Sequence, residues 1–152
     1  MIVVSVIGYQ DSGKTTLIEE LVPTLATYGR VGTVKSIHHD VEIDTPGTDT
    51  YRHRSAGAQA VIGITPSLRF SIMRDEREKS ESLHRTLTSL AADGFDFVLV
   101  EGFKESNLPY IALGEAGDRE FPGHCLECIP TGSSPDPDEL ATRIRRLDSW
   151  NA

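Results

Sequence analysis

"GYQDSGKT", residues 8–15, lies between the apolar run "MIVVSVI" and the segment "TLIEEL". Gly8, four further residues and then Gly13, Lys14 and Thr15 give the spacing G-x-x-x-x-G-K-S/T of a phosphate-binding loop. The run before it is typical of a buried strand, and the apolar residues after it recur at helical spacing. The sequence therefore predicts a strand, a phosphate loop and a helix N-terminus, in that order.

The predicted loop has the chemistry to bind a nucleotide and Mg²⁺. Free backbone N–H groups and the positive end of the helix dipole attract an anion. Lys14 can reach the β- and γ-phosphate oxygens, and the Thr15 hydroxyl can bind Mg²⁺. Asp11 would repel a phosphate unless its carboxylate points outward or orients a water. We predict nucleotide contacts along the whole loop: Gly8, Tyr9, Gln10, Asp11, Ser12, Gly13, Lys14, Thr15 and Thr16.

Length and composition fit one nucleotide-binding domain over residues 1–152. The chain is 38% hydrophobic, which is enough to fill one core. It has no apolar run of about 18 residues and begins as a strand without a basic leader, so we expect no membrane span, no signal peptide and a cytoplasmic location. Fifteen basic and 23 acidic residues give a net charge of −8, which argues against a nucleic-acid partner.

Strand and helix patterns alternate along the rest of the chain. A helix is predicted near residues 78–92, and a last helix begins at Asp136 as N-cap. We expect Pro23 to kink or divide the first helix, and residues 115–123 to form a loop. Strands are predicted at residues 30–37, 59–65, 68–74, 95–103 and 109–114. The expected fold is a three-layer α/β domain of the P-loop NTPase type with a mostly parallel sheet.

A carboxylate for the metal is predicted at the end of the strand at 95–103. The apolar residues "FVLV" lead directly into Glu101, at the carboxyl edge where the phosphate loop also lies. This is a Walker B-like arrangement with Glu in place of Asp, and it predicts a metal site from Thr15 and Glu101, with Lys14 and Glu101 as catalytic groups. The alternative is a solvated acid at a strand end.

A second candidate acid is Asp44 in "DTPG", because many GTPases use D-x-x-G to hold Mg²⁺ through water. We rank Asp44 second, since the strand expected before it, Val41–Ile43, is short and interrupted by Glu42. The nucleotide base cannot be read from an N-K-x-D motif, because neither asparagine of the chain lies in one.

Four stretches, "GYQDSGKTTL", "VGTVKSIHHD", "DTPGTDTYRHRSAGA" and "VLVEGFK", together resemble the MobB family of molybdopterin-guanine dinucleotide biosynthesis adaptor proteins over residues 2–104. The resemblance implies a GTP-binding, weakly hydrolysing homodimer that assists the guanylyltransferase MobA in joining GMP to molybdopterin. One departure is Lys35-Ser36, where the family often has Lys-His. The resemblance also implies a second patch from His39, Asp44, Gly47, Asp49 and Arg52.

The residues of this second patch also suggest a site on their own chemistry. A polar loop can be lined by His38, His39, Asp40, Asp44 and Asp49. Charge for a phosphate or pterin comes from Arg52, His53 and Arg54. The alternative is a solvated loop before a helix capped by Thr48 or Asp49. A metal site from the two histidines is disfavoured, because adjacent strand residues face opposite sides.

The two cysteines, Cys125 and Cys128, form a C-x-x-C motif beside His124. One chain then shows half of a tetrahedral zinc site, which a dimer could complete. The pair could instead be a redox couple or chemically inert.

Three function classes remain open. The first is an adaptor that binds GTP and hydrolyses it slowly, because only Gln10 and Asp11 in the loop and Arg52 and Arg54 nearby could assist hydrolysis. The second is a small-molecule P-loop kinase, which the lack of an Arg-rich lid at residues 73–80 weakens. The third is a metallochaperone GTPase that uses the histidines and cysteines.

Overall fold

The computed structural model describes residues 1–151 and divides them into two compact units. The second unit is the segment Ile37–Glu78, and the first unit is formed by the described residues before and after it. A compact unit inserted into another need not fold alone, so a single domain over residues 1–152 stays a prediction.

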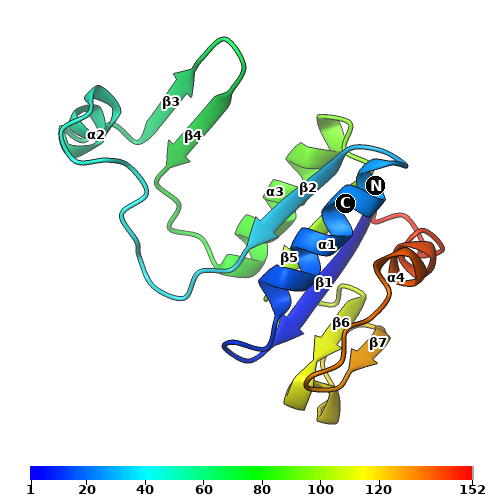
Figure 1. Ribbon diagram of the computed structural model, residues 1–152. Coiled ribbons are helices and arrows are strands. Elements are labelled where there is room, and N and C mark those ends of the chain that lie inside the picture. The colour runs from blue at the N-terminus through cyan, green and yellow to red at the C-terminus, as the bar shows by residue number, and fades with distance from the viewer. Residues whose placement is uncertain (152) are drawn as a thin grey trace. The chain divides into compact units, whose positions relative to one another are not determined.

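The first unit is built on a five-stranded sheet (Figure 1). Its strands lie in the order β2-β5-β1-β6-β7, and every neighbouring pair is parallel. The mostly parallel sheet predicted from the sequence is therefore confirmed. The strands are β1 (Ile2–Gly8), β2 (Val31–Lys35), β5 (Phe97–Glu101), β6 (Tyr110–Leu113) and β7 (Cys125–Ile129).

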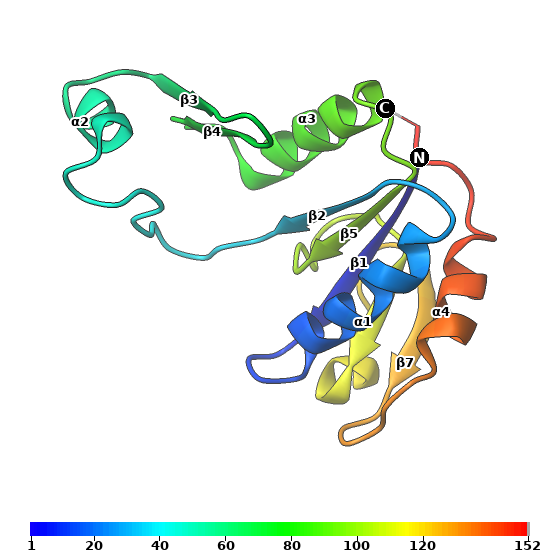
Figure 2. The same cartoon turned by 45° about the horizontal axis from the view of Figure 1, so that its top comes forward.

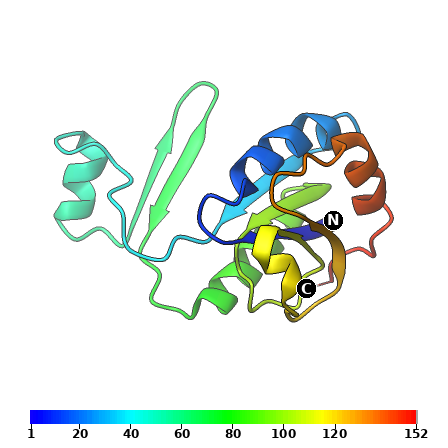
Figure 3. The same cartoon turned by 60° about the horizontal axis from the view of Figure 1, so that its bottom comes forward.

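Helices cover both faces of this sheet. Helices α1 (Lys14–Ala26) and α4 (Pro137–Ile144) pack their buried leucines and isoleucines on Val4 and Val6 of β1. Helix α3 (Lys79–Ala92) packs on the opposite face, which includes Val3. Figures 2 and 3 show α1 and α4 on one side of the sheet and α3 on the other. Alternate residues of β1 thus enter different cores, which confirms the three layers.

Several local predictions were wrong. Helix α1 is not divided at Pro23 and runs to Ala26, because a proline in the last turn removes one hydrogen bond without breaking the turns before it. Residues Val41–Ile43 form no strand. Part of the expected loop is a short 3₁₀ helix, η1 (Gly114–Asp118), and strand β7 was not predicted at all.

The second unit contains helix α2 (Asp49–Ser55) and an antiparallel hairpin of β3 (Ala60–Ile64) and β4 (Arg69–Met73). Both strands lie where the sequence predicted them. The Thr48 hydroxyl accepts a hydrogen bond of 3.3 Å from the Tyr51 N–H, so Thr48 is the cap of α2. None of the helices within residues 1–151 has the length and apolar character needed to cross a membrane.

Candidate functional site

The phosphate loop connects the end of β1 to the start of α1, and both motif glycines have a steric role there. Gly13 is the N-cap of α1 with φ of 89°, in the left-handed region that favours glycine. A Cβ atom on Gly8 would lie 2.2 Å from the Ser12 Oγ atom. The tight closure of the loop therefore depends on glycine at both positions.

The loop borders a cavity of about 430 Å³ at the carboxyl edge of the sheet. This volume lies within the range of about 300–1,000 Å³ that is common for small-molecule pockets. The cavity brings most of the predicted loop residues together with the predicted metal acid, whereas Gly8 and Tyr9 do not line it. Its lining residues are Gln10, Asp11, Ser12, Gly13, Lys14, Thr15, Thr16, Lys35 and Glu101.

Glu101 and Thr15 converge inside this cavity. The Thr15 hydroxyl oxygen lies 3.4 Å and 3.5 Å from the two carboxylate oxygens of Glu101, whose side chain is only 13% exposed. A carboxylate and a hydroxyl are the hard oxygen ligands that Mg²⁺ accepts, and Mg²⁺ usually keeps waters and substrate phosphate oxygens as its other ligands. The donor set therefore fits a nucleotide-bound Mg²⁺.

Lys35 is a cavity residue that the sequence reasoning missed. Its Nζ atom lies 3.0 Å from Glu101 Oε1, and its side chain is 57% exposed. The register of β2 and β5 pairs these two residues directly. A usable signal was present, since both predicted strands end near these positions and parallel strands share a carboxyl edge. The site thus has two lysines rather than one.

The side chain of Lys14 is folded back over its own loop. Its Nζ atom donates a hydrogen bond of 2.5 Å to the Tyr9 carbonyl oxygen and lies 3.5 Å from the Ser12 Oγ atom. Asp11 has φ of 58°, an unusual backbone conformation for a residue with a side chain, and it is exposed. Lys14 is therefore positioned at the cavity with only uncharged oxygens as hydrogen-bond acceptors.

The predicted second patch belongs to the second unit, and His39, Asp44, Asp49 and Arg52 are not among the residues that line the cavity. Asp44 accepts hydrogen bonds from the Thr45 N–H (2.8 Å) and from the Thr48 hydroxyl (3.1 Å).

Hydrogen bonding, chiefly from the Thr50 side chain, lowers the pKa of Asp44. Asp44 therefore stabilises the turn that leads into α2. Its hydrogen bonds with Thr45 and Thr48 favour a structural role for Asp44 over a role in ligand binding.

The two arginines considered as aids to hydrolysis have partners within the second unit. Arg54 forms an ion pair with Glu42, and its guanidinium lies 5.6 Å from the ring centre of Tyr51. Arg52 lies 3.5 Å from Asp49, three residues earlier on α2. Lys35 is the additional cation that lines the cavity itself.

A family model described as "Molybdopterin guanine dinucleotide synthesis protein B" matches residues 3–124, which include the phosphate loop, Lys35 and Glu101. The chain belongs to the MobB family. The resemblance noted from the sequence is thereby confirmed, and the matched region ends one residue before Cys125.

Individual MobB relatives agree with this assignment. The molybdopterin-guanine dinucleotide biosynthesis adapter proteins of Escherichia coli and Haemophilus influenzae are 35% and 39% identical over 112 and 113 residues, or 72% and 70% of this chain. The chain spans between 47% and 63% of the length of three curated relatives. The crystal structure of Bacillus subtilis MobB, 20% identical, has a TM-score of 0.75 and covers 99% of this chain and 100% of its own. That likeness confirms the P-loop NTPase-like fold.

Proposed function

We propose that this MobB-family chain is a cytoplasmic, homodimeric GTP-binding adaptor in the biosynthesis of the molybdenum cofactor molybdopterin guanine dinucleotide. It holds GTP with Mg²⁺ for a MobA-type guanylyltransferase acting on molybdopterin, and it hydrolyses GTP only weakly alone. The observation that carries the proposal is the cavity in which the phosphate loop meets Glu101 and Lys35. The adapter function named for the Escherichia coli and Haemophilus influenzae relatives supports the pathway.

The loop residues have distinct roles in holding the nucleotide. The free N–H groups at the start of α1 bind phosphate oxygens, and Lys14 exchanges the Tyr9 carbonyl for the β- and γ-phosphates. Thr15 and Glu101 hold Mg²⁺, which neutralises phosphate charge when it is bound. Lys35 forms an ion pair with Glu101 and so balances its charge.

Weak GTP hydrolysis is expected from the side chains around the proposed phosphate position. Fast phosphoryl transfer needs a positioned nucleophile and a cation at the developing charge, in addition to the loop and the metal. Gln10 and Asp11 are the polar loop side chains that could orient a water, and both are exposed. Lys35, the extra cation, is paired with Glu101. Such a site holds GTP in a defined pose more readily than it cleaves it.

The isolated protein is therefore expected to hydrolyse GTP well below the roughly 1–100 s⁻¹ that is typical of kinases. The measurement is multiple-turnover phosphate release from GTP and from ATP, with Lys14→Ala as the control for contaminating enzymes. The same assay with a MobA-type enzyme and molybdopterin is expected to yield guanine dinucleotide faster than without this protein. Partner-independent turnover of several per second that disappears in Lys14→Ala would defeat the adaptor proposal.

A homodimer is supported by one face of the β3–β4 hairpin, which carries exposed apolar side chains. Ile62, Ile64 and Met73 share this face by strand alternation, and Leu68 lies in the connecting turn. Ile64 is 80% exposed, and the other three are at least half exposed. An isolated two-stranded hairpin is marginal in water, and contiguous exposed apolar side chains mark an interface. A second copy can cover this face in a two-fold contact of like with like.

Ile64→Lys is expected to dissociate this homodimer. The two-fold axis places the change twice in the interface. The dimer therefore loses at least about 3 kcal/mol of binding free energy from apolar burial, and its dissociation constant rises about 100-fold or more. Sedimentation at micromolar concentration measures the effect. Ser89→Lys, which adds the same charge at an exposed position of α3, is the matched control and should remain dimeric. An Ile64→Lys variant that stays dimeric would place the interface elsewhere.

A further inference from the structure

The C-x-x-C pair lies outside the proposed GTP site, and strand β7 brings its two thiols together. Residues three apart in a regular strand face opposite sides. Here Tyr110 pairs with Cys125 and Ala112 pairs with Cys128, with a register shift between these two pairs. The shift is a β-bulge, and it turns both cysteines to the face of the sheet on which Tyr110 and Ala112 lie.

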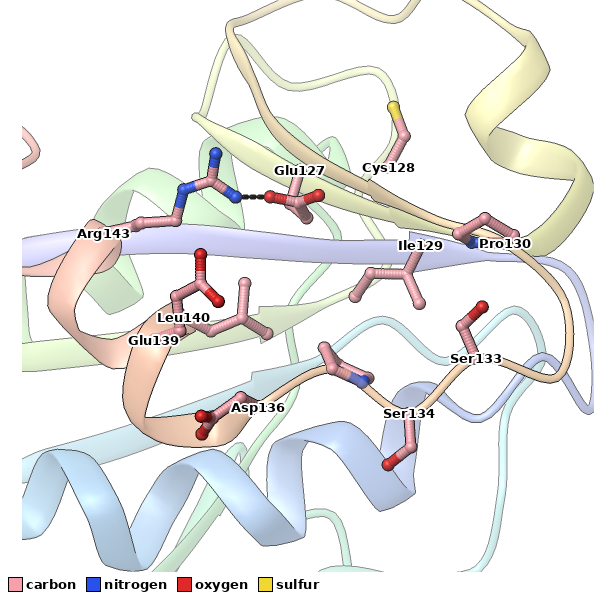
Figure 4. A pocket seen from close by; sticks show the side chains of 11 residues that line it. Glu127, Cys128, Ile129, Pro130, Ser133, Ser134, Asp136, Glu139, Leu140 and Arg143 are labelled. Carbon is pink, nitrogen blue, oxygen red and sulfur yellow. Dashed lines mark ion pairs between the residues drawn. The ribbon is translucent and has the colours of Figure 1, made fainter.

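The distance between the two sulfurs agrees with this geometry. The Sγ atoms of Cys125 and Cys128 are 3.1 Å apart, and both cysteines are free thiols. Cys128 and Leu140 line the same pocket, and Figure 4 shows the Cys128 side chain pointing away from Leu140. The sulfurs are therefore about 1 Å further apart than in an S–S bond, which is about 2.05 Å long.

The two thiols differ in their surroundings. Cys128 is exposed, whereas Cys125 is partly buried against a small cluster that includes Tyr110 and Phe121. Burial, followed by the hydrogen bond with Cys128, raises the pKa of the Cys125 thiol to about 11. An exposed thiol reacts first with a dissolved oxidant, and a neighbouring thiol then closes the bond.

We propose that Cys125 and Cys128 are a modification site, a dithiol that peroxides and small-molecule disulfides convert reversibly to an intrachain disulfide. With a peroxide, the Cys128 sulfur takes one peroxide oxygen to form a sulfenic acid, and water leaves. The Cys125 sulfur then attacks that sulfur, the S–O bond breaks, and the leaving hydroxide takes the Cys125 proton as a second water. With a small disulfide, each attack releases one small thiol instead.

A shared metal is less well supported by the same residues. Tetrahedral zinc needs four ligands. Within residues 1–151, no group of three or more histidine, cysteine, aspartate or glutamate side chains is placed to hold a metal ion. The disulfide needs only the two sulfurs that the bulge already brings together. This site goes beyond the proposed GTP function and does not depend on it.

The test oxidises the reduced, full-length protein with hydrogen peroxide or oxidised glutathione and follows intact mass and free thiols. The wild type is expected to lose two hydrogen atoms and both thiols, to recover them with a dithiol reductant, and to react faster as the pH rises from 7 to 9, because the thiolate is the attacking form.

The single variants separate the roles of the two cysteines. Cys125→Ser should accumulate the glutathione adduct on Cys128. Cys128→Ser should form an adduct at least about tenfold more slowly, since the remaining Cys125 thiol is less accessible and burial raises its pKa. A stable wild-type adduct, a disulfide between two copies, no reaction, or co-purified zinc that protects both thiols would each overturn the proposal.

Discussion

Lys14→Ala weakens GTP binding by about 10- to 150-fold, which is the expected result of removing one charge-assisted contact of about 1.5–3 kcal/mol. The Lys14 ammonium has the Tyr9 carbonyl oxygen as its nearest acceptor, at 2.5 Å. Such a neutral acceptor is readily exchanged for a phosphate. The loss should be larger for GTP than for GMP, because in the proposed complex the lysine reaches the β- and γ-phosphates.

The fold of this variant should stay intact, because Lys14 is not part of any of the apolar clusters of the core. Calorimetric titration measures the affinity, and circular dichroism checks the fold. Arg85→Ala, at an exposed position of α3, removes the same charge away from the cavity and should bind GTP as the wild type does. Unchanged GTP affinity in folded Lys14→Ala would show that the cavity is not the nucleotide site.

Glu101→Gln is expected to remove most of the Mg²⁺-dependent part of GTP binding, by about tenfold or more, and to leave binding without Mg²⁺ nearly unchanged. The amide keeps the shape of the carboxylate but lacks the charge that a hard cation requires. The Thr15 hydroxyl, 3.4 Å from Glu101, remains as a weaker ligand. Titrations of GTP with Mg²⁺ and with a chelator measure the two parts separately.

Asp44→Asn is the matched variant, because it makes the same change in the rival acid. Asp44 accepts hydrogen bonds from Thr45 and Thr48, so its loss should lower the stability of the turn before α2 and leave the metal dependence alone. If Asp44→Asn loses the metal dependence and Glu101→Gln keeps it, our ranking of the two acids is reversed.

The parts of the fold that the sequence predicted are those coded by local patterns. The phosphate loop and its flanks need only a short segment, since glycine spacing and apolar runs act within a few residues. The parallel sheet also followed, because a strand buried on both faces reads as a continuous apolar run. The position of Glu101 at the end of a buried strand was predicted from the apolar run "FVLV" before it.

What was missed depends on contacts between distant segments. Strand β7 is short, carries Glu127 at its centre and gains its strand geometry from pairing with β6 across a bulge. Lys35 is a site residue only because strand β2 pairs with strand β5. This pairing places Lys35 beside Glu101, which lies 66 residues later in the sequence. The apolar residues Val41 and Ile43 suggested a strand, but both are exposed and neither pairs with a strand within residues 1–151.

The ion pair between Lys35 and Glu101 has a thermodynamic consequence for the order in which ligands load. A divalent cation that reaches Glu101 without a nucleotide leaves the Lys35 ammonium without its carboxylate partner, which lies 3.0 Å from it. When the cation comes with a triphosphate, the phosphate oxygens give Lys35 a new anionic partner. The binding free energies of cation and nucleotide should therefore be coupled with positive cooperativity, so that each tightens the other by the same factor.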